Sequence, residues 1–161
     1  MSMSAGALGL MSGWETSTRD FDGLTIDAPK AFLDRSTLVL RSPDAQGGFR
    51  LNIVITRGRT EEDVEAVAQH LRDTIERNGP EGLVLGDLRP FTIKNAAGQA
   101  LEFKHAEPIG LEGALVSMTR MHVIAERNGT TFHIIATHLS DWFDANRSQV
   151  EGMLKSVGLP G

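Results

Sequence analysis

Hydrophobic and polar residues alternate most clearly between Val116 and Leu139. Asn128-Gly129 interrupts the alternation, and this pair favours a type I′ hairpin turn because both central residues of that turn need positive φ. With this turn, one face of the hairpin is apolar and is predicted to face the core: Met121, Val123, Ala125, Phe132, Ile134 and Ala136. The other face mixes apolar and polar side chains and is predicted to be functional: Arg120, His122, Ile124, His133, Ile135 and Thr137.

Further alternating runs predict strands elsewhere in the chain. The first run contains Asp22-Gly23, which could also form a tight turn. A turn is predicted at 96–98, and a loop rich in Pro and Gly is predicted at 106–113. The runs predicted as strands are 21–27, 36–41, 49–57, 82–95 and 100–105.

Two segments carry the helical period. The first is predicted to begin with Thr60 as N-cap and Asp63 in the capping box, and to end at Asn78, with Gly79 in the left-handed conformation. The second is predicted to begin at Ser140 as N-cap and to end near Val157. The element order predicts an α+β fold, in which an antiparallel sheet of about six or seven strands has two main helices packed on its core face.

Composition narrows the class of protein. The chain has 161 residues and no cysteine, and the absence of cysteine excludes disulfides and thiolate metal sites. Its net charge of −5 gives no electrostatic reason to expect nucleic acid as a partner. Residues 1–13 are predicted to be a flexible leader, and residues 14–161 a single domain. Because the chain has neither a signal-peptide pattern nor a long apolar run, a cytoplasmic location without membrane insertion is expected.

Candidate catalytic chemistry is sparse. His122 and His133 lie diagonally across the predicted hairpin, but a zinc site needs three or four ligands, so neither a metal nor a cofactor is expected. His138, Ser140 and Asp141 have the residue types of a hydrolase triad but are crowded at one strand end, and helix capping by Ser140 explains them more simply. A non-enzymatic protein is therefore predicted. A small hydrolase or metal enzyme using His122, His133 or His138 is the alternative from another class.

Several local patterns resemble the DcrB-related family of the Mog1/PsbP-like fold. The resemblance spans roughly Phe21 to Val157 and rests on strand and turn patterns without catalytic residues. The segments that carry it are Phe21-x-Gly23-Leu24-x-Ile26-x-Ala28-Pro29, Phe32-x-Asp34-Arg35-Ser36, 51–57, Gly98-x-Ala100-x-x-Phe103, and Gly129 to Leu139 leading into Trp142.

The resemblance implies an α/β/α sandwich that binds a partner rather than catalysing a reaction. One cytosolic branch is similar to the Eag chaperones of type VI secretion, which are dimers that shield apolar N-terminal helices of Rhs or PAAR effectors. A homodimer and an effector partner are therefore implied, while the alternative is a stand-alone DcrB-like module that binds another protein or a small ligand. The implied binding surface is the non-core face of the sheet, on which Asn52, Val54 and Thr56 join the six residues of the hairpin. Arg120 and two histidines make this face more polar than a helix-shielding groove needs.

Overall fold

The computed structural model describes residues 16–21, 24–29, 37–41, 45, 49–59, 61–109 and 111–160. The chain divides into two compact units, residues 1–35 and 36–161, which are described separately. The predicted leader lies outside the described residues, and the prediction of one domain over 14–161 stays a prediction. In the first unit, β1 (Thr16–Phe21) pairs antiparallel with β2 (Leu24–Pro29). The single strand predicted at 21–27 is therefore wrong, while the alternative turn at Asp22-Gly23 falls outside the described residues.

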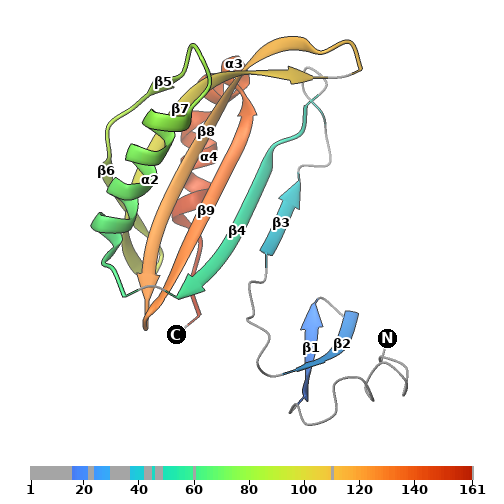
Figure 1. Cartoon of the computed structure of the whole chain (residues 1–161), viewed down its shortest axis with the longest axis vertical. Helices are drawn as coiled ribbons and strands as arrows, with labels where there is room; N and C mark the ends of the chain where they lie inside the picture. Colours follow the sequence, from blue (N-terminus) through green and yellow to red (C-terminus); the bar gives the residue numbers. More distant parts are fainter. Residues whose placement is uncertain are drawn as a thin grey trace. The chain divides into compact units, whose positions relative to one another are not determined.

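The second unit is built on a seven-stranded antiparallel sheet (Figure 1). Its strand order is β3-β4-β9-β8-β7-β5, and β6 pairs with the first part of the long strand β7. The predicted antiparallel α+β sheet is thereby confirmed. The strands are β3 (Thr37–Arg41), β4 (Asn52–Arg59), β5 (Val84–Leu85), β6 (Arg89–Ile93), β7 (Ala96–Ile109), β8 (Ala114–Arg127) and β9 (Thr130–Leu139).

The β8–β9 hairpin at the centre of the sheet agrees with the sequence prediction. Asn128 and Gly129 have φ of 51° and 75°, as a type I′ turn requires. The register places Ile124 opposite His133 and His122 opposite Ile135. The side chains predicted for the core face are all at most 5% exposed: Met121, Val123, Ala125, Phe132, Ile134 and Ala136.

Two helices cover this core face, which we call the first face. They are α3 (Ser140–Ala145) and α4 (Arg147–Lys155), and Figure 1 shows them behind the sheet. Phe143, Val150 and Leu154 are fully buried in the same cluster as the core residues of the hairpin. At the edge of this layer, Arg147 donates two hydrogen bonds to the Glu102 carboxylate, at 2.5 and 2.7 Å. This pairing ties α4 to β7.

The helix α2 (Val64–Asn78) lies on the opposite face, which we call the second face (Figure 1). It packs against β7 and β8, next to Phe103 and Arg120. The expectation that both helices pack on the core face is therefore wrong, whereas the α/β/α sandwich implied by the family resemblance is confirmed. The apolar residues Leu101 and Phe103 provide the reason, because they alternate with Ala100 on β7 and give the second face a core of its own.

The ends of α2 differ from the prediction. Asp63, and not Thr60, is the N-cap, and its side chain accepts a hydrogen bond from the Ala66 amide at 2.7 Å. At the other end, Gly79 is extended, with φ −67° and ψ 158°, so it is not a left-handed cap. A glycine is required there for space, because a Cβ would lie 2.5 Å from both the Ile75 carbonyl oxygen and Leu83 Cδ2.

Three predictions within the sheet are also wrong. The single strand predicted at 82–95 is divided into β5 and β6. The β6–β7 turn falls at Lys94-Asn95, where Asn95 exchanges hydrogen bonds with the Leu159 backbone, and not at 96–98. Gly98 lies inside β7, where a Cβ would be 2.5 Å from the Ile124 carbonyl oxygen. The first half of the predicted loop at 106–113 is strand, because β7 continues to Ile109, and residues 111–113 form a turn before β8 begins at Ala114.

The predicted C-terminal helix is two helices separated at Asn146. Ser140 is the first residue of α3 and not its N-cap. Its hydroxyl oxygen lies 2.8 Å from that of Ser117 and accepts a hydrogen bond from Thr119 at 2.9 Å. The hydroxyl is therefore used to join α3 to β8.

The position at which α2 begins can be tested by replacing its N-cap residue. Replacing Asp63 by Ala removes the acceptor for the Ala66 amide and is expected to lower the free energy of unfolding by about 1 kcal/mol. The matched variant Glu61→Ala removes an exposed carboxylate just before the helix and should change stability by less than about 0.5 kcal/mol. Urea denaturation measures both, and equal effects would contradict a cap at Asp63.

Candidate binding face

The predicted binding residues lie in three rows that run across the strands of the second face. In the first row, Val54 pairs with Ile135, which pairs with His122. In the second, Asn52 pairs with Thr137, which pairs with Arg120. In the third, Thr56 pairs with His133, which pairs with Ile124. The strand register therefore brings all nine residues to one face, although only part of that face is open.

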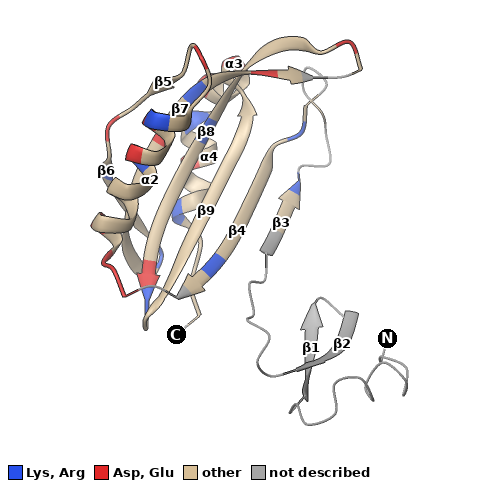
Figure 2. Ribbon diagram, viewed as in Figure 1, with Lys and Arg blue, Asp and Glu red and all other residues tan. Residues whose placement is uncertain are grey.

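The open part lies over β3, β4 and β9. Within residues 36–161, the described helices leave these strands uncovered on the second face (Figure 1). Val39 extends the first row onto the edge strand β3 and is 52% exposed, and β9 carries no Lys, Arg, Asp or Glu (Figure 2). A cavity of about 390 Å³ extends from β4 and β9 across β8 to the end of β7, and it is lined by Phe49, Asn52, Val54, Glu107, Pro108, Met118, Arg120, Ile135 and Thr137.

The remaining part of the face is closed by α2. His122 is 9% exposed and Ile124 is 1% exposed, so neither side chain is on the accessible surface. Of the nine predicted residues, those that line the cavity are Asn52, Val54, Arg120, Ile135 and Thr137. Ile124 and His122 are better described as the packing surface for α2, because the helix occupies the place that a partner would take.

Arg120 is the cation in the lining of the open cavity. Its Nη2 lies 3.4 Å from Glu107 Oε1, a longer distance than the roughly 2.7–2.9 Å of a strong charge-assisted hydrogen bond. Its Nε is buried and has no acceptor among the described residues. The Asn52 Oδ1 is also buried and has no donor among them. These two unpaired polar atoms lie on β8 and β4, which are separated by β9.

The histidines of the second face are held in the neutral form. Burial, together with smaller contributions from His133 and Arg120, lowers the pKa of His122 to about 4. Burial also lowers the pKa of His133. Phe103 packs on the His122 ring with a centroid distance of 5.4 Å. Neutral imidazoles in an apolar setting suit packing better than proton transfer at neutral pH.

The residues considered for a triad lie on the first face. His138 is fully buried and stacks on Trp142 with a centroid distance of 4.0 Å, and its Nδ1 accepts a hydrogen bond from the Leu139 amide. The Ser140 hydroxyl is instead hydrogen-bonded to the hydroxyls of Ser117 and Thr119. Among the described residues, no group of three or more His, Asp or Glu side chains is placed to hold a metal ion.

The sequence prediction missed four residues that line the open cavity: Phe49, Glu107, Pro108 and Met118. Met118 and Glu107 share the alternation of Arg120 and Phe103, so extending the two strands would have found them. The prediction instead ended β7 at His105, because Pro108 and nearby glycines favour a loop. A second cavity, beside α2, was not predicted at all.

The fold and this face define an α/β/α sandwich protein whose second face is only partly covered by α2 and carries a ligand-sized cavity in its open part. The sequence profile of the DcrB family matches residues 24–156, and the chain belongs to that family. The resemblance to DcrB-related proteins is thereby confirmed.

The fold is shared by a solved structure of low sequence identity. The crystal structure of PA94, a protein of unknown function from Pseudomonas aeruginosa, has a TM-score of 0.66 and 17% identity, and covers 91% of this chain and 98% of that one. The solution structure of cyanobacterial PsbP (CyanoP) from Synechocystis sp. PCC 6803 has a TM-score of 0.42 and 10% identity, with 87% and 88% covered. Comparison with curated proteins found no match. No helix in the described ranges is long and apolar enough to cross a membrane.

Proposed function

We propose that this chain is a non-enzymatic, cytoplasmic binding protein whose open β3–β4–β9 surface receives an apolar helical segment of a protein partner. The observation that carries this proposal is the row Val39, Val54 and Ile135, in which three apolar side chains from adjacent strands lie side by side. The row borders the cavity that contains Arg120 and Asn52. An amphipathic or apolar helix binds by laying its apolar side into such a surface, and the polar groups orient it.

The partner that fits this chemistry is a secreted effector with apolar N-terminal helices, of the Rhs or PAAR type exported by type VI secretion. Such a helix exposes an apolar surface that would aggregate in water unless it is covered. The family resemblance supports this partner, and a homodimer would enclose the helix more fully than one copy. The chain would then act as a chaperone or adaptor before export.

A second candidate is a stand-alone module that binds a small ligand. The observation that favours it is the size of the open cavity, about 390 Å³, which falls within the roughly 300–1,000 Å³ of small-molecule sites. The covering of His122 and Ile124 by α2 also shortens the surface that a helix could occupy. Under this candidate, a soluble ligand and not a helix would protect the open face.

The helix-binding proposal predicts a charge-sensitive interface at the open face. The test uses an apolar segment of about 20 residues from the N-terminus of an Rhs or PAAR effector, fused to a soluble carrier and co-expressed with this chain. The wild-type chain should keep the fusion in solution and co-purify with it. Val39→Glu and Val54→Glu each place a carboxylate against the apolar helix and should weaken binding at least roughly tenfold.

Val84→Glu is the matched control, because Val84 is 66% exposed on the edge strand β5 and outside the proposed surface. It should bind like the wild type. Failure of the wild-type chain to retain any such segment would refute the helix-binding proposal. Equal losses in all three variants would show that the open face is not the contact surface.

A further inference from the structure

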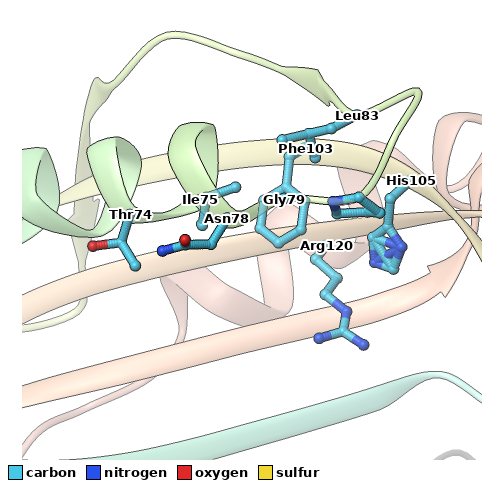
Figure 3. Close-up of a pocket in the computed structure, with 9 residues that line it drawn as sticks. Thr74, Ile75, Asn78, Gly79, Leu83, Phe103, His105 and Arg120 are labelled. Atoms are coloured by element: carbon cyan, nitrogen blue, oxygen red, sulfur yellow. The ribbon is translucent and has the colours of Figure 1, made fainter.

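A second cavity lies beneath the C-terminal end of α2 (Figure 3). Its volume is about 290 Å³, close to the lower end of the roughly 300–1,000 Å³ range of small-molecule sites. It is bounded by α2, the segment that follows it, and the strands β7 and β8. The lining residues are Thr74, Ile75, Asn78, Gly79, Pro80, Leu83, Phe103, His105 and Arg120.

The walls of this cavity are mainly apolar and are held in place. Ile75 comes from α2, Leu83 from the segment after it, and Phe103 from β7. Phe103 is packed between two imidazoles, with His105 at 5.7 Å and His122 at 5.4 Å between ring centroids. Leu83 can approach α2 closely because Gly79 has no side chain. A hydrocarbon group would find preformed apolar surfaces here, so little ordering would be needed on binding.

One end of the cavity is cationic. Figure 3 shows Arg120 and His105 together at this end, away from Thr74 and Asn78. The Arg120 Nε has no acceptor among the described residues, and its Nη2 has only the long contact with Glu107. Nε and Nη2 form one side of the planar guanidinium, which is the geometry that binds both oxygens of a carboxylate. A ligand carboxylate on this fork would take the place of Glu107, whose contact with Nη2 is long, and would give the buried Nε an acceptor.

His105 adds a neutral donor or acceptor at the same end. Burial lowers the pKa of His105 and the nearby Arg120 lowers it further, while Glu107 acts in the opposite direction. The neutral imidazole carries one N–H, which can donate to an anionic oxygen without adding a second charge. The end of the cavity thus offers one full positive charge and one neutral hydrogen-bonding ring.

We propose that this cavity binds a small amphipathic monocarboxylate, with its carboxylate on Arg120 and its hydrocarbon part between Ile75 and Phe103. The cavity volume favours a medium-chain aliphatic or single-ring aromatic acid over a long-chain lipid. This function goes beyond helix binding at the open face. Arg120 lines both cavities, so the two functions are separated by Val39 and Val54, which lie outside the lining of this cavity.

Octanoate and 1-octanol are the probes, since they share a hydrocarbon chain and differ in charge. Isothermal titration calorimetry with the full chain should show saturable octanoate binding and at least about tenfold weaker binding of octanol. Arg120→Met removes the charge but keeps an apolar stem, and should weaken octanoate binding roughly 10- to 100-fold with little change for octanol. Arg127→Met, at the C-terminal end of β8 and outside the cavity lining, is the matched control and should bind octanoate like the wild type.

A third variant tests the location of the hydrocarbon part. Ile75→Trp fills the cavity from α2 and should abolish binding of both probes, while thermal unfolding confirms that the variant folds. Chemical-shift changes in wild-type NMR spectra should map to the cavity residues. Absence of saturable octanoate binding to the wild-type chain would overturn the proposal. Equal affinity for octanol, or unchanged octanoate affinity in Arg120→Met, would overturn the carboxylate site.

Discussion

Acidification is expected to destabilise the fold by about 3 kcal/mol between pH 6.5 and about 4, chiefly through His122. Its pKa is about 4 in the folded protein and 6.5 in an unstructured peptide, which represents the unfolded chain. Below pH 6.5 the unfolded chain therefore takes up a proton that folded His122 does not. Stability falls as the pH drops through this window and levels off once folded His122 is also protonated.

The physical cause is a buried ring without hydrogen-bond partners. Neither nitrogen of His122 has a partner among the described residues, and α2 and Phe103 exclude solvent from it. A proton placed there would also face the positive charge of Arg120. The folded state thus resists protonation much more than the unfolded chain does.

His122→Leu removes the titrating group and should flatten most of this pH dependence. Urea denaturation at a series of pH values measures the effect. A smaller slope should remain, because the pKa values of His105, His133 and His138 are also lowered by burial. Thr92→Leu, at an exposed position on β6, also introduces a leucine but removes no titratable group. It should keep the pH dependence of stability of the wild type. An unchanged slope in His122→Leu would contradict this account.

The central hairpin could be predicted from sequence because its signals are local. Asn128-Gly129 requires a particular turn, and the period of two then fixes which residues share a face. The position of α2 could not be predicted in the same way. Its stripe from Val64 to Ile75 fits any apolar surface, and β7 offers Ala100 to one face and Leu101 to the other. Whether His122 and Ile124 are buried depends on which face of the sheet α2 packs against.

The predicted turn at 96–98 shows how tertiary contacts override a local rule. Ala96-Ala97-Gly98 has turn-like composition, but Gly98 is needed inside β7 for the close approach of the Ile124 carbonyl. The true turn at Lys94-Asn95 is supported by hydrogen bonds from Asn95 to Leu159, which is 64 residues away in sequence. A short segment of sequence, from which a turn is predicted, does not contain both residues of that contact. The second cavity was missed for the same reason, since it depends on where α2 packs.

Phe143→Ala is expected to lower the free energy of unfolding by about 3–5 kcal/mol. Phe143 is fully buried between α3 and the sheet, so the substitution removes its apolar contacts and leaves a cavity. The Arg147 guanidinium lies over the ring at 5.3 Å and also binds Glu102, so the loss extends to the link between α4 and β7. Denaturant and thermal unfolding measure the change.

Met153→Ala on α4 is the matched control, because Met153 is 36% exposed and outside the buried cluster. It should cost less than about 1 kcal/mol. Phe143 lies on the first face, so the Ala variant, wherever it is still folded, should retain the partner and ligand affinities of the second face. A loss of stability similar to that of Met153→Ala would contradict the packing of α3. A loss of affinity in the folded variant would show that the two faces are coupled through the sheet.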